Sequence, residues 1–308
     1  MKIIMIGHGM VGHKFIESVL EHVGDDVEIT ILAEEPRLAY DRVHLTEYFS
    51  GKSAKDLTLC RADFADAYGI DLRLNTKAVA IDQSHKTVTT NHGDVLSFDK
   101  LILATGSYAF VPPISGNDRE NCFVYRTIED LDAIRAASLN AKSGVVIGGG
   151  LLGLEAAKAL RDLNLETHVV EFAPRLMAVQ IDDLGGKVLR AKIENLGVKV
   201  HTQKATSSIE EGTATKHVMK FGDGSELETD IILFSAGIRP RDELARQSGL
   251  ALGERGGIMI NDYCQTSNPD IYAIGECALW QNKIYGLVAP GYDMARIAAK
   301  HVTEQTCA

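Results

Sequence analysis

The stretch KIIMIGHGMVGHKFIESVLEHVGDDVEITILAE, residues 2–34, decides the fold class of this chain of 308 residues. A short apolar run leads into Gly7, Gly9 and Gly12 in G-x-G-x-x-G spacing, and an amphipathic segment and a second apolar run follow, up to Glu34. This order predicts a strand, a tight turn, a helix and a strand, as in a dinucleotide-binding unit. The alternative is a glycine-rich turn without a ligand, which the three glycines alone do not exclude.

Each residue of the pattern has a physical role in such a unit. Gly7 permits the sharp turn, and Gly9 leaves room for a pyrophosphate to approach the backbone. Gly12 lets the predicted helix, residues 10–23, pack closely on the strand, and free N–H groups at the helix start face the phosphates. Glu34 is placed to accept hydrogen bonds from the ribose hydroxyls of an adenosine.

The same pattern returns at residues 144–171, GVVIGGGLLGLEAAKALRDLNLETHVVE. The residues that repeat the first pattern are Gly148, Gly150, Gly153 and Glu171. Each half later reaches an apolar strand that ends in a small-residue turn, KLILATG at 100–106 and IILFSAG at 231–237. Because the accessory parts are doubled together with the glycines, the sequence predicts two dinucleotide sites.

The segments between these patterns extend the organisation. The loop after Glu34 is longer than a connection requires, so we expect it to cover a ligand, with Arg42 neutralising a pyrophosphate or, alternatively, pairing with Asp41. Alternating residues predict β-structure over 70–98. The proline-containing run FVPPISG, residues 110–116, indicates a crossing between domains.

Helix and strand signals continue to the C-terminus. Thr127 and Asp130 form a capping box that predicts a helix through residue 137. Residues 271–274 predict a buried strand, and a last helix is expected to start near Ala289, where Pro290 is acceptable in the first turn. A simple packing helix is the alternative for this last segment.

Composition limits the class of protein. The formal net charge is −10 and no basic run occurs, which argues against a nucleic-acid partner. No apolar run is long enough to cross a membrane, and Met1 leads directly into a strand, so we expect a cytoplasmic protein without a cleaved leader. The five cysteines are Cys60, Cys122, Cys264, Cys277 and Cys307. They are scattered, so we expect reduced, mostly structural thiols and no metal site.

Taken together, these motifs resemble the FAD-dependent pyridine nucleotide reductases over essentially the whole chain. The resemblance implies an α/β fold with two Rossmann-like domains, in which an NAD domain (110–234) is inserted into an FAD domain (1–109 and 235–308). The usual C-terminal interface domain is not expected within these residues. By motif, FAD would be bound by Gly7, Gly9, Gly12, Glu34, Arg42, Thr105, Gly106, Gly275, Glu276, Val288 and Ala289. NADH would be bound by Gly148, Gly150, Gly153, Glu155, Glu171 and Gly237, with Glu155 near the nicotinamide.

More narrowly, runs such as YDRVHLTEYF, GGGLLGLEAA and FSAGIRPRD are similar to the N-terminal diaphorase part of the large subunits of NADH-dependent nitrite reductases. The resemblance implies a module of nitrate assimilation that passes hydride from NADH to FAD and electrons onward. Nitrite reduction to ammonium would need iron–sulfur and sirohaem centres located downstream of this chain. Glu47 stands where rubredoxin and ferredoxin reductases usually carry a lysine beside the flavin, which supports this choice.

Alternatives remain open at this point. One is a stand-alone rubredoxin- or ferredoxin-type reductase, and another is a redox sensor that binds FAD and NAD but turns over slowly. The cysteines that disulfide reductases and related peroxidases carry near the flavin are missing, so thiol redox chemistry is not expected. Glu171 should favour NADH over NADPH by repelling a 2′-phosphate, and Arg175 could soften this preference.

Overall fold

The computed structural model describes residues 1–22 and 27–304, so Val23 of the predicted helix and Cys307 lie outside the described residues. The chain divides into two compact units. Unit 1 contains residues 1–43, 57–108 and the chain from Arg239 onward, and unit 2 contains 44–56 and 109–238. The expected segments ended at 109 and 234, so the main difference is the short excursion of 44–56 into unit 2.

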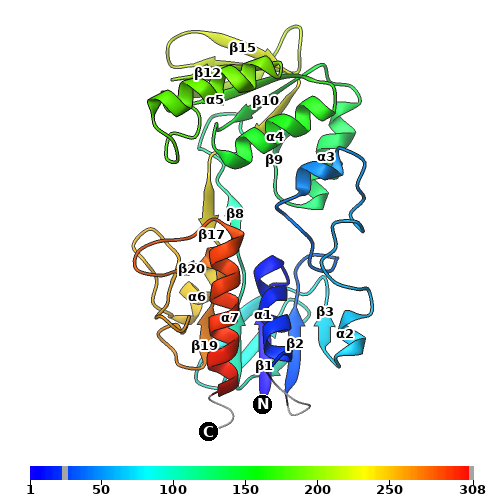
Figure 1. Cartoon of the computed structure of the whole chain (residues 1–308), viewed down its shortest axis with the longest axis vertical. Helices are drawn as coiled ribbons and strands as arrows, with labels where there is room; N and C mark the ends of the chain where they lie inside the picture. The colour runs from blue at the N-terminus through cyan, green and yellow to red at the C-terminus, as the bar shows by residue number, and fades with distance from the viewer. Residues whose placement is uncertain (23–26, 305–308) are drawn as a thin grey trace. The chain divides into compact units, whose positions relative to one another are not determined.

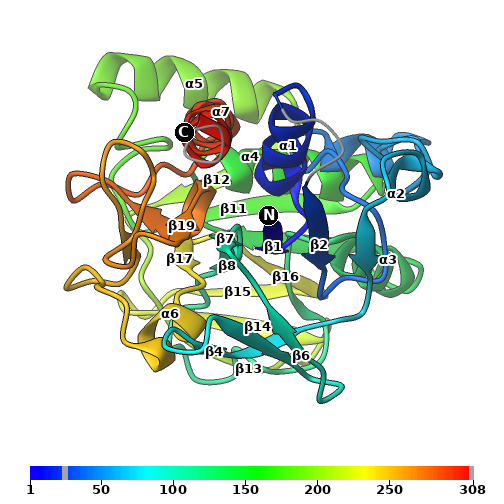
Figure 2. The same cartoon turned by 90° about the horizontal axis from the view of Figure 1, so that it is seen from below.

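Unit 1 is built on a five-stranded parallel sheet in the order β19-β7-β1-β2-β3. Its strands are β1 (Lys2–Ile6), β2 (Glu28–Leu32), β3 (Asp71–Arg73), β7 (Lys100–Leu103) and β19 (Ile271–Ala273). The helices α1 (Met10–Leu20) and α7 (Val288–Glu304) lie side by side on one face (Figures 1 and 2). The central strands are almost wholly apolar because both faces of the sheet are covered.

The rest of unit 1 packs around this sheet. The antiparallel meander β4 (Ala78–Asp82), β5 (Thr87–Thr90) and β6 (Val95–Ser97) contacts α6 (Glu243–Ser248). Smaller elements are α2 (Phe64–Ala67), η2 (Gly275–Cys277), and the paired strands β18 (Ile258–Met259) and β20 (Ala278–Leu279). These positions confirm the β-structure that was predicted over 70–98 and the last helix.

Unit 2 repeats the design with the parallel sheet order β12-β11-β10-β16-β9. Its strands are β9 (Cys122–Val124), β10 (Ser143–Ile147), β11 (Glu166–Glu171), β12 (Val198–Thr202) and β16 (Ile231–Phe234). The helices α4 (Leu151–Asp162) and α5 (Asp183–Asn195) pack on it, as Figure 1 shows. An antiparallel sheet is added by β13 (Thr206–Glu211), β14 (His217–Phe221) and β15 (Glu226–Thr229).

Local signals explain the remaining elements. The predicted capping box is present at α3 (Ile128–Ser138), where Thr127 Oγ1 accepts the Asp130 N–H at 3.3 Å and Asp130 Oδ2 accepts the Thr127 N–H at 2.8 Å. The excursion 44–56 carries the short helix η1 (Leu45–Tyr48), which packs on α4. The chain also passes between the units in β8 (Ser107–Ala109) and β17 (Ile238–Pro240), which pair with each other.

Candidate dinucleotide sites

The first glycine loop joins β1 to α1 in unit 1. The Gly7 N–H donates to the Leu32 carbonyl at 2.9 Å, and the Ala104 N–H donates to the Ile6 carbonyl at 2.8 Å, so the loop is held between β2 and β7. Gly7 has a φ of 102°, and a Cβ at this position would collide with the Ala104 carbonyl oxygen. Only glycine fits this turn, as the spacing predicted.

Space for a ligand opens at the second glycine of the loop. Within the described residues, and apart from Gly9 and its two chain neighbours, no heavy atom lies within 4 Å of the position that a Cβ on Gly9 would take. A Cβ on Gly12, in contrast, would meet the Gly7 carbonyl oxygen. Gly9 is the N-cap residue of α1 and has no side chain that could accept the first N–H groups of this helix. An anionic phosphate is a suitable acceptor at such a helix start.

The loop between β10 and α4 in unit 2 has the same construction. Gly148 has a φ of 119°, and a Cβ there would collide with the Ser235 carbonyl oxygen. Gly150 is open and precedes α4 without a side-chain cap, while Gly153 packs against the Gly148 carbonyl. The two loops therefore offer the same kind of anion site, one in each unit.

The acid at the end of β11 is held by the second loop. Glu171 Oε2 accepts the Gly149 N–H at 2.5 Å, and Oε1 accepts the Ala173 N–H at 2.7 Å. Both oxygens thus keep a fixed position at the carboxyl end of the sheet. A carboxylate at this place is suited to the ribose hydroxyls of an adenosine.

The acid Glu34 of the first half lies in a different environment. The last residue of β1, Ile6, pairs with Leu32 of β2, and the last residue of β10, Ile147, pairs with Val170 of β11. Glu171 is the first residue after Val170, whereas Glu34 is the second residue after Leu32. Glu34 forms ion pairs with Lys77 at 3.1 Å and Arg241 at 3.0 Å, and its side chain is 49% exposed. The role of Glu34 as a ribose ligand stays a prediction.

Arg42 lies in unit 1 near the start of α1. Its guanidinium forms a close ion pair with Glu35, and the guanidinium carbon lies 4.7 Å from the centre of the Tyr40 ring. The alternative pairing of Arg42 with Asp41 stays a prediction. Burial lowers the pKa of Arg42, but Tyr40, Glu35 and Glu276 outweigh it and raise the pKa above the ordinary value. The spacing alone did not single out Glu35 and Tyr40, since their contact with Arg42 depends on how the loop folds back.

The small-residue turn after β7 is fastened to the chain that follows β17. Thr105 Oγ1 donates to the Arg241 carbonyl at 2.6 Å, and the Arg241 N–H donates to the Gly106 carbonyl at 2.9 Å. Ser107 Oγ donates to Glu276 Oε2 at 2.7 Å. The structure therefore brings Thr105, Gly106 and Glu276 into one region of unit 1, which their distance in sequence does not reveal.

The start of α7 joins the first glycine loop. The helix begins at Val288, one residue before the predicted Ala289. A Cβ on Gly291 would lie 2.6 Å from a methyl of Val11, and one on Gly275 would lie 3.4 Å from the same side chain. The first turns of α1 and α7 and the η2 turn therefore meet at Val11, beside the open glycine.

Unit 2 places a second polar group beside its glycine loop. Burial raises the pKa of Glu155 in α4, and His44 opposes this effect. Tyr125 is 7% exposed and follows β9, and burial and then Glu155 raise the pKa of its hydroxyl. Phe49 stacks on the Tyr125 ring with centroids 6.5 Å apart. The excursion 44–56 thus contributes side chains to the carboxyl end of the unit 2 sheet. Gly237, which follows β16, accepts the Phe110 N–H at 2.9 Å.

The four cysteines within the described residues are all free thiols. Burial raises the pKa of Cys60 and raises that of Cys122 to about 11 and of Cys264 to about 12. Cys277 is fully buried, and its pKa is also raised by burial. These thiols stay protonated near neutral pH, which does not favour nucleophilic or disulfide chemistry. No group of three or more metal-binding side chains occurs in residues 1–22 and 27–304.

Two parallel sheets, each with an open, uncapped glycine loop at the start of a helix, define an α/β protein of the two-dinucleotide oxidoreductase class. None of the helices in the described part of the chain is long and apolar enough to cross a membrane. Comparison with known proteins agrees with this class. Residues 1–301 match the pyridine nucleotide-disulphide oxidoreductase family, and the chain belongs to this family.

Individual relatives narrow the comparison. The chain is 55% identical over 303 residues to the NADH nitrite reductase large subunit of Escherichia coli, covering 98% of this chain and 36% of that protein. It spans about a third of the length of its nitrite reductase relatives. It is 29% identical to the rubredoxin-NAD(+) reductase of Alcanivorax borkumensis, covering 99% of this chain and 79% of that protein. A ferredoxin reductase structure from Rhodopseudomonas palustris matches with a TM-score of 0.92 at 26% identity, covering 98% and 76% of the two chains. The resemblance and the fold class predicted from sequence are confirmed.

Proposed function

We propose that this chain is a flavoprotein module that takes a hydride from NADH onto FAD and passes the electrons onward. The observation that carries the proposal is the pair of glycine loops, each with an open second glycine at an uncapped helix start, one in each unit. Two phosphate-accepting helix starts fit two dinucleotides. The relative from Escherichia coli is named for NADH, which supports the nicotinamide cofactor.

We assign FAD to unit 1 and NADH to unit 2. The residues proposed to hold FAD are Gly7, Gly9, Gly12, Glu34, Arg42, Thr105, Gly106, Gly275, Glu276, Val288 and Ala289. Those proposed to hold NADH are Gly148, Gly150, Gly153, Glu155, Glu171 and Gly237. The assignment is supported by the meeting of α1, α7 and η2 at Val11, because it gathers the residues proposed for FAD around the first loop.

The residues of the chain bind and orient rather than act as acids or bases. Bound FAD supplies the chemistry, since it accepts a hydride and can release electrons one at a time. The start of α7 presents backbone N–H groups that favour negative charge. Glu171 fixes the adenosine ribose and disfavours a 2′-phosphate, which supports NADH as the donor.

We propose that the onward electrons go to iron–sulfur and sirohaem centres of a longer nitrite reductase, which would reduce nitrite to ammonium. The identity of 55% to the Escherichia coli subunit supports this acceptor. We also propose a cytoplasmic location. A stand-alone reductase of a small redox protein is the second candidate, supported by the match over 79% of a rubredoxin-NAD(+) reductase.

Absorption spectroscopy tests the proposal. The purified chain with added FAD should show a bound-flavin band that NADH bleaches stoichiometrically in the absence of oxygen. A chain that retains no FAD, or a bound flavin that NADH does not bleach, would contradict the assignment. Slow, substoichiometric bleaching would instead favour a redox sensor. Rapid reduction of rubredoxin or ferredoxin by the chain alone would favour the second candidate.

A further inference from the structure

Glu35 joins two side chains of the loop that follows β2. One carboxylate oxygen accepts a hydrogen bond from the Tyr40 hydroxyl at 2.8 Å, and the other forms a close ion pair with Arg42 Nη2. The guanidinium carbon of Arg42 also lies 4.7 Å from the centre of the Tyr40 ring. Glu35, Tyr40 and Arg42 therefore form one connected group, the Glu35 cluster, in which each member contacts the other two.

The Glu35 cluster lies beside the first glycine loop. The Arg42 N–H contacts the sulfur of Met10, the first residue of α1, at 3.4 Å. The Arg42 side chain is 25% exposed and that of Glu35 is 32% exposed, so water only partly screens their interaction. Glu276, at the η2 turn, is also close enough to raise the pKa of Arg42. A guanidinium held by a carboxylate and a ring keeps one orientation, which is what bidentate binding of a phosphate requires.

We propose that Glu35 is a positioning residue that, with the Tyr40 hydroxyl, holds Arg42 toward the pyrophosphate of the dinucleotide in unit 1. This inference rests on the proposed function, because it takes FAD as the ligand of unit 1. By charge alone, the Glu35 carboxylate should weaken the binding of an anionic pyrophosphate. Removal of this carboxylate should therefore weaken FAD binding if Glu35 positions Arg42, and strengthen FAD binding if only its charge matters.

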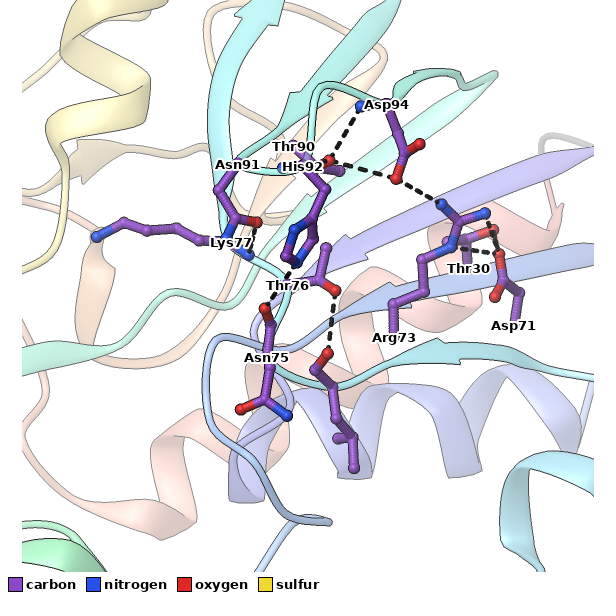
Figure 3. A network of polar contacts seen from close by, with 11 residues as sticks. Thr30, Asp71, Arg73, Asn75, Thr76, Lys77, Thr90, Asn91, His92 and Asp94 are labelled. Carbon is purple, nitrogen blue, oxygen red and sulfur yellow. Dashed lines mark hydrogen bonds and ion pairs between the residues drawn. The ribbon is translucent and has the colours of Figure 1, made fainter.

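The same unit offers a matched control pair. Asp71 and Arg73 lie on β3, where Arg73 Nη2 is 2.8 Å from Asp71 Oδ2 and the two side chains are 47% and 32% exposed. Arg73 also reaches Asp94 at 3.4 Å, which connects β3 to the meander (Figure 3). Asp71→Asn removes a carboxylate from an arginine in the same way as Glu35→Gln, but from an arginine that is not proposed to hold FAD.

The test measures the dissociation constant of FAD from the whole chain by flavin fluorescence. The variants are Glu35→Gln, Arg42→Met, the double variant of these two, and Asp71→Asn. We expect Glu35→Gln to weaken FAD binding about tenfold, and the double variant to bind no more weakly than Arg42→Met alone, because Glu35 acts through Arg42. Asp71→Asn should leave the constant within about twofold of the wild type.

Three results would overturn the inference. The first is unchanged or tighter FAD binding by Glu35→Gln. The second is a loss of affinity that is as large when Glu35→Gln is added to Arg42→Met as when it is made in the wild type. The third is a loss in Asp71→Asn as large as that in Glu35→Gln. The second result would make Glu35 a direct ligand. Tyr40→Phe removes only the hydroxyl and should cause a smaller loss in the same direction, so it keeps the test decisive if Glu35→Gln does not fold. If the wild type has no affinity for FAD, the proposed function is rejected. If the wild type binds FAD and one of the three results is found, only the role inferred for Glu35 is rejected.

Discussion

The Glu171 side chain accepts a hydrogen bond from the Gly149 backbone N–H at 2.5 Å, so the last residue of β11 is fixed to the second glycine loop. The Ala173 N–H holds the other carboxylate oxygen at 2.7 Å. A charge that is held in this way cannot swing away from an approaching 2′-phosphate. The position of Glu171 should therefore decide which nicotinamide dinucleotide unit 2 accepts.

Glu171→Gln should reduce the preference of the chain for NADH over NADPH. The amide keeps one acceptor for the Gly149 N–H but removes the charge that repels a 2′-phosphate, so we expect the ratio of the kcat/KM values to fall about tenfold. Steady-state kinetics with each nucleotide and ferricyanide as the acceptor measures this ratio. The control is Glu166→Gln at the exposed start of the same strand, where Glu166 pairs with Lys199. An unchanged ratio in Glu171→Gln would remove Glu171 from cofactor selection.

The glycine loops were predictable from sequence because their requirements are local. Gly7 and Gly148 need a positive φ and a close backbone approach, which only glycine provides at that spacing. The different environments of Glu34 and Glu171 were not predictable, because they depend on strand register. Glu171 directly follows the last residue of β11 that pairs with β10, whereas Glu34 lies two residues after the last residue of β2 that pairs with β1. A sequence pattern does not specify that register.

The excursion of 44–56 into unit 2 shows the same limit. Arg135 of α3 donates to the Tyr48 carbonyl and stacks on the Tyr48 ring at 4.1 Å, and Ser50 donates to Asp162 at 3.0 Å. These contacts join residues that are more than eighty positions apart. Tertiary packing therefore decided the path of a loop that the sequence analysis expected only to cover a ligand.

Gly9→Val should abolish the binding of FAD alone, and Gly150→Val should abolish the binding of NADH alone. Both glycines have ordinary negative φ values and open space at the Cβ position, so each variant should fold with a loss of stability below about 1 kcal/mol. The new side chain would fill the space that a pyrophosphate needs. Gly9→Val should lose bound flavin, whereas Gly150→Val should keep the flavin and lose its bleaching by NADH. Absorption spectra and thermal melts check both, and a Gly9→Val chain with normal flavin content would place FAD elsewhere.

Cys60→Ser and Cys122→Ser should retain the reduction of flavin by NADH. Burial raises the pKa of both thiols, so near neutral pH they are protonated and react slowly. We expect each variant to keep activity within about twofold of the wild type, and iodoacetamide to modify the native chain slowly at pH 7.5. Mass spectrometry follows the modification, with urea-unfolded chain as the fast-reacting reference. Rapid loss of activity on alkylation would show that a thiol takes part in the reaction.

Acid should destabilise unit 1 through His8, which lies between Gly7 and Gly9. Burial, and then the nearby His13, lower the pKa of His8 to about 4, and the two rings lie edge to face at 5.5 Å. Because the pKa in the folded state is below the unfolded value of 6.5, the unfolded state binds more protons as the pH falls. The free energy of unfolding should therefore be highest above pH 6.5 and fall between pH 6.5 and 4, by up to about 1.4 kcal/mol per pH unit for this histidine.

Urea denaturation at pH 7.5 and pH 5 tests this pH dependence. His8→Asn removes the titrating ring, so the loss of stability between the two values should be smaller than in the wild type by about 1 to 2 kcal/mol. His92→Asn is the control, since His92 is an exposed histidine of the meander that contacts the Asn75 carbonyl at 3.1 Å (Figure 3). A buried imidazole resists protonation, so His8 should contribute to the acid sensitivity of the wild type, and His92→Asn should behave like the wild type. If His8→Asn instead loses as much stability on acidification as these two proteins, the acid sensitivity of unit 1 arises from other groups.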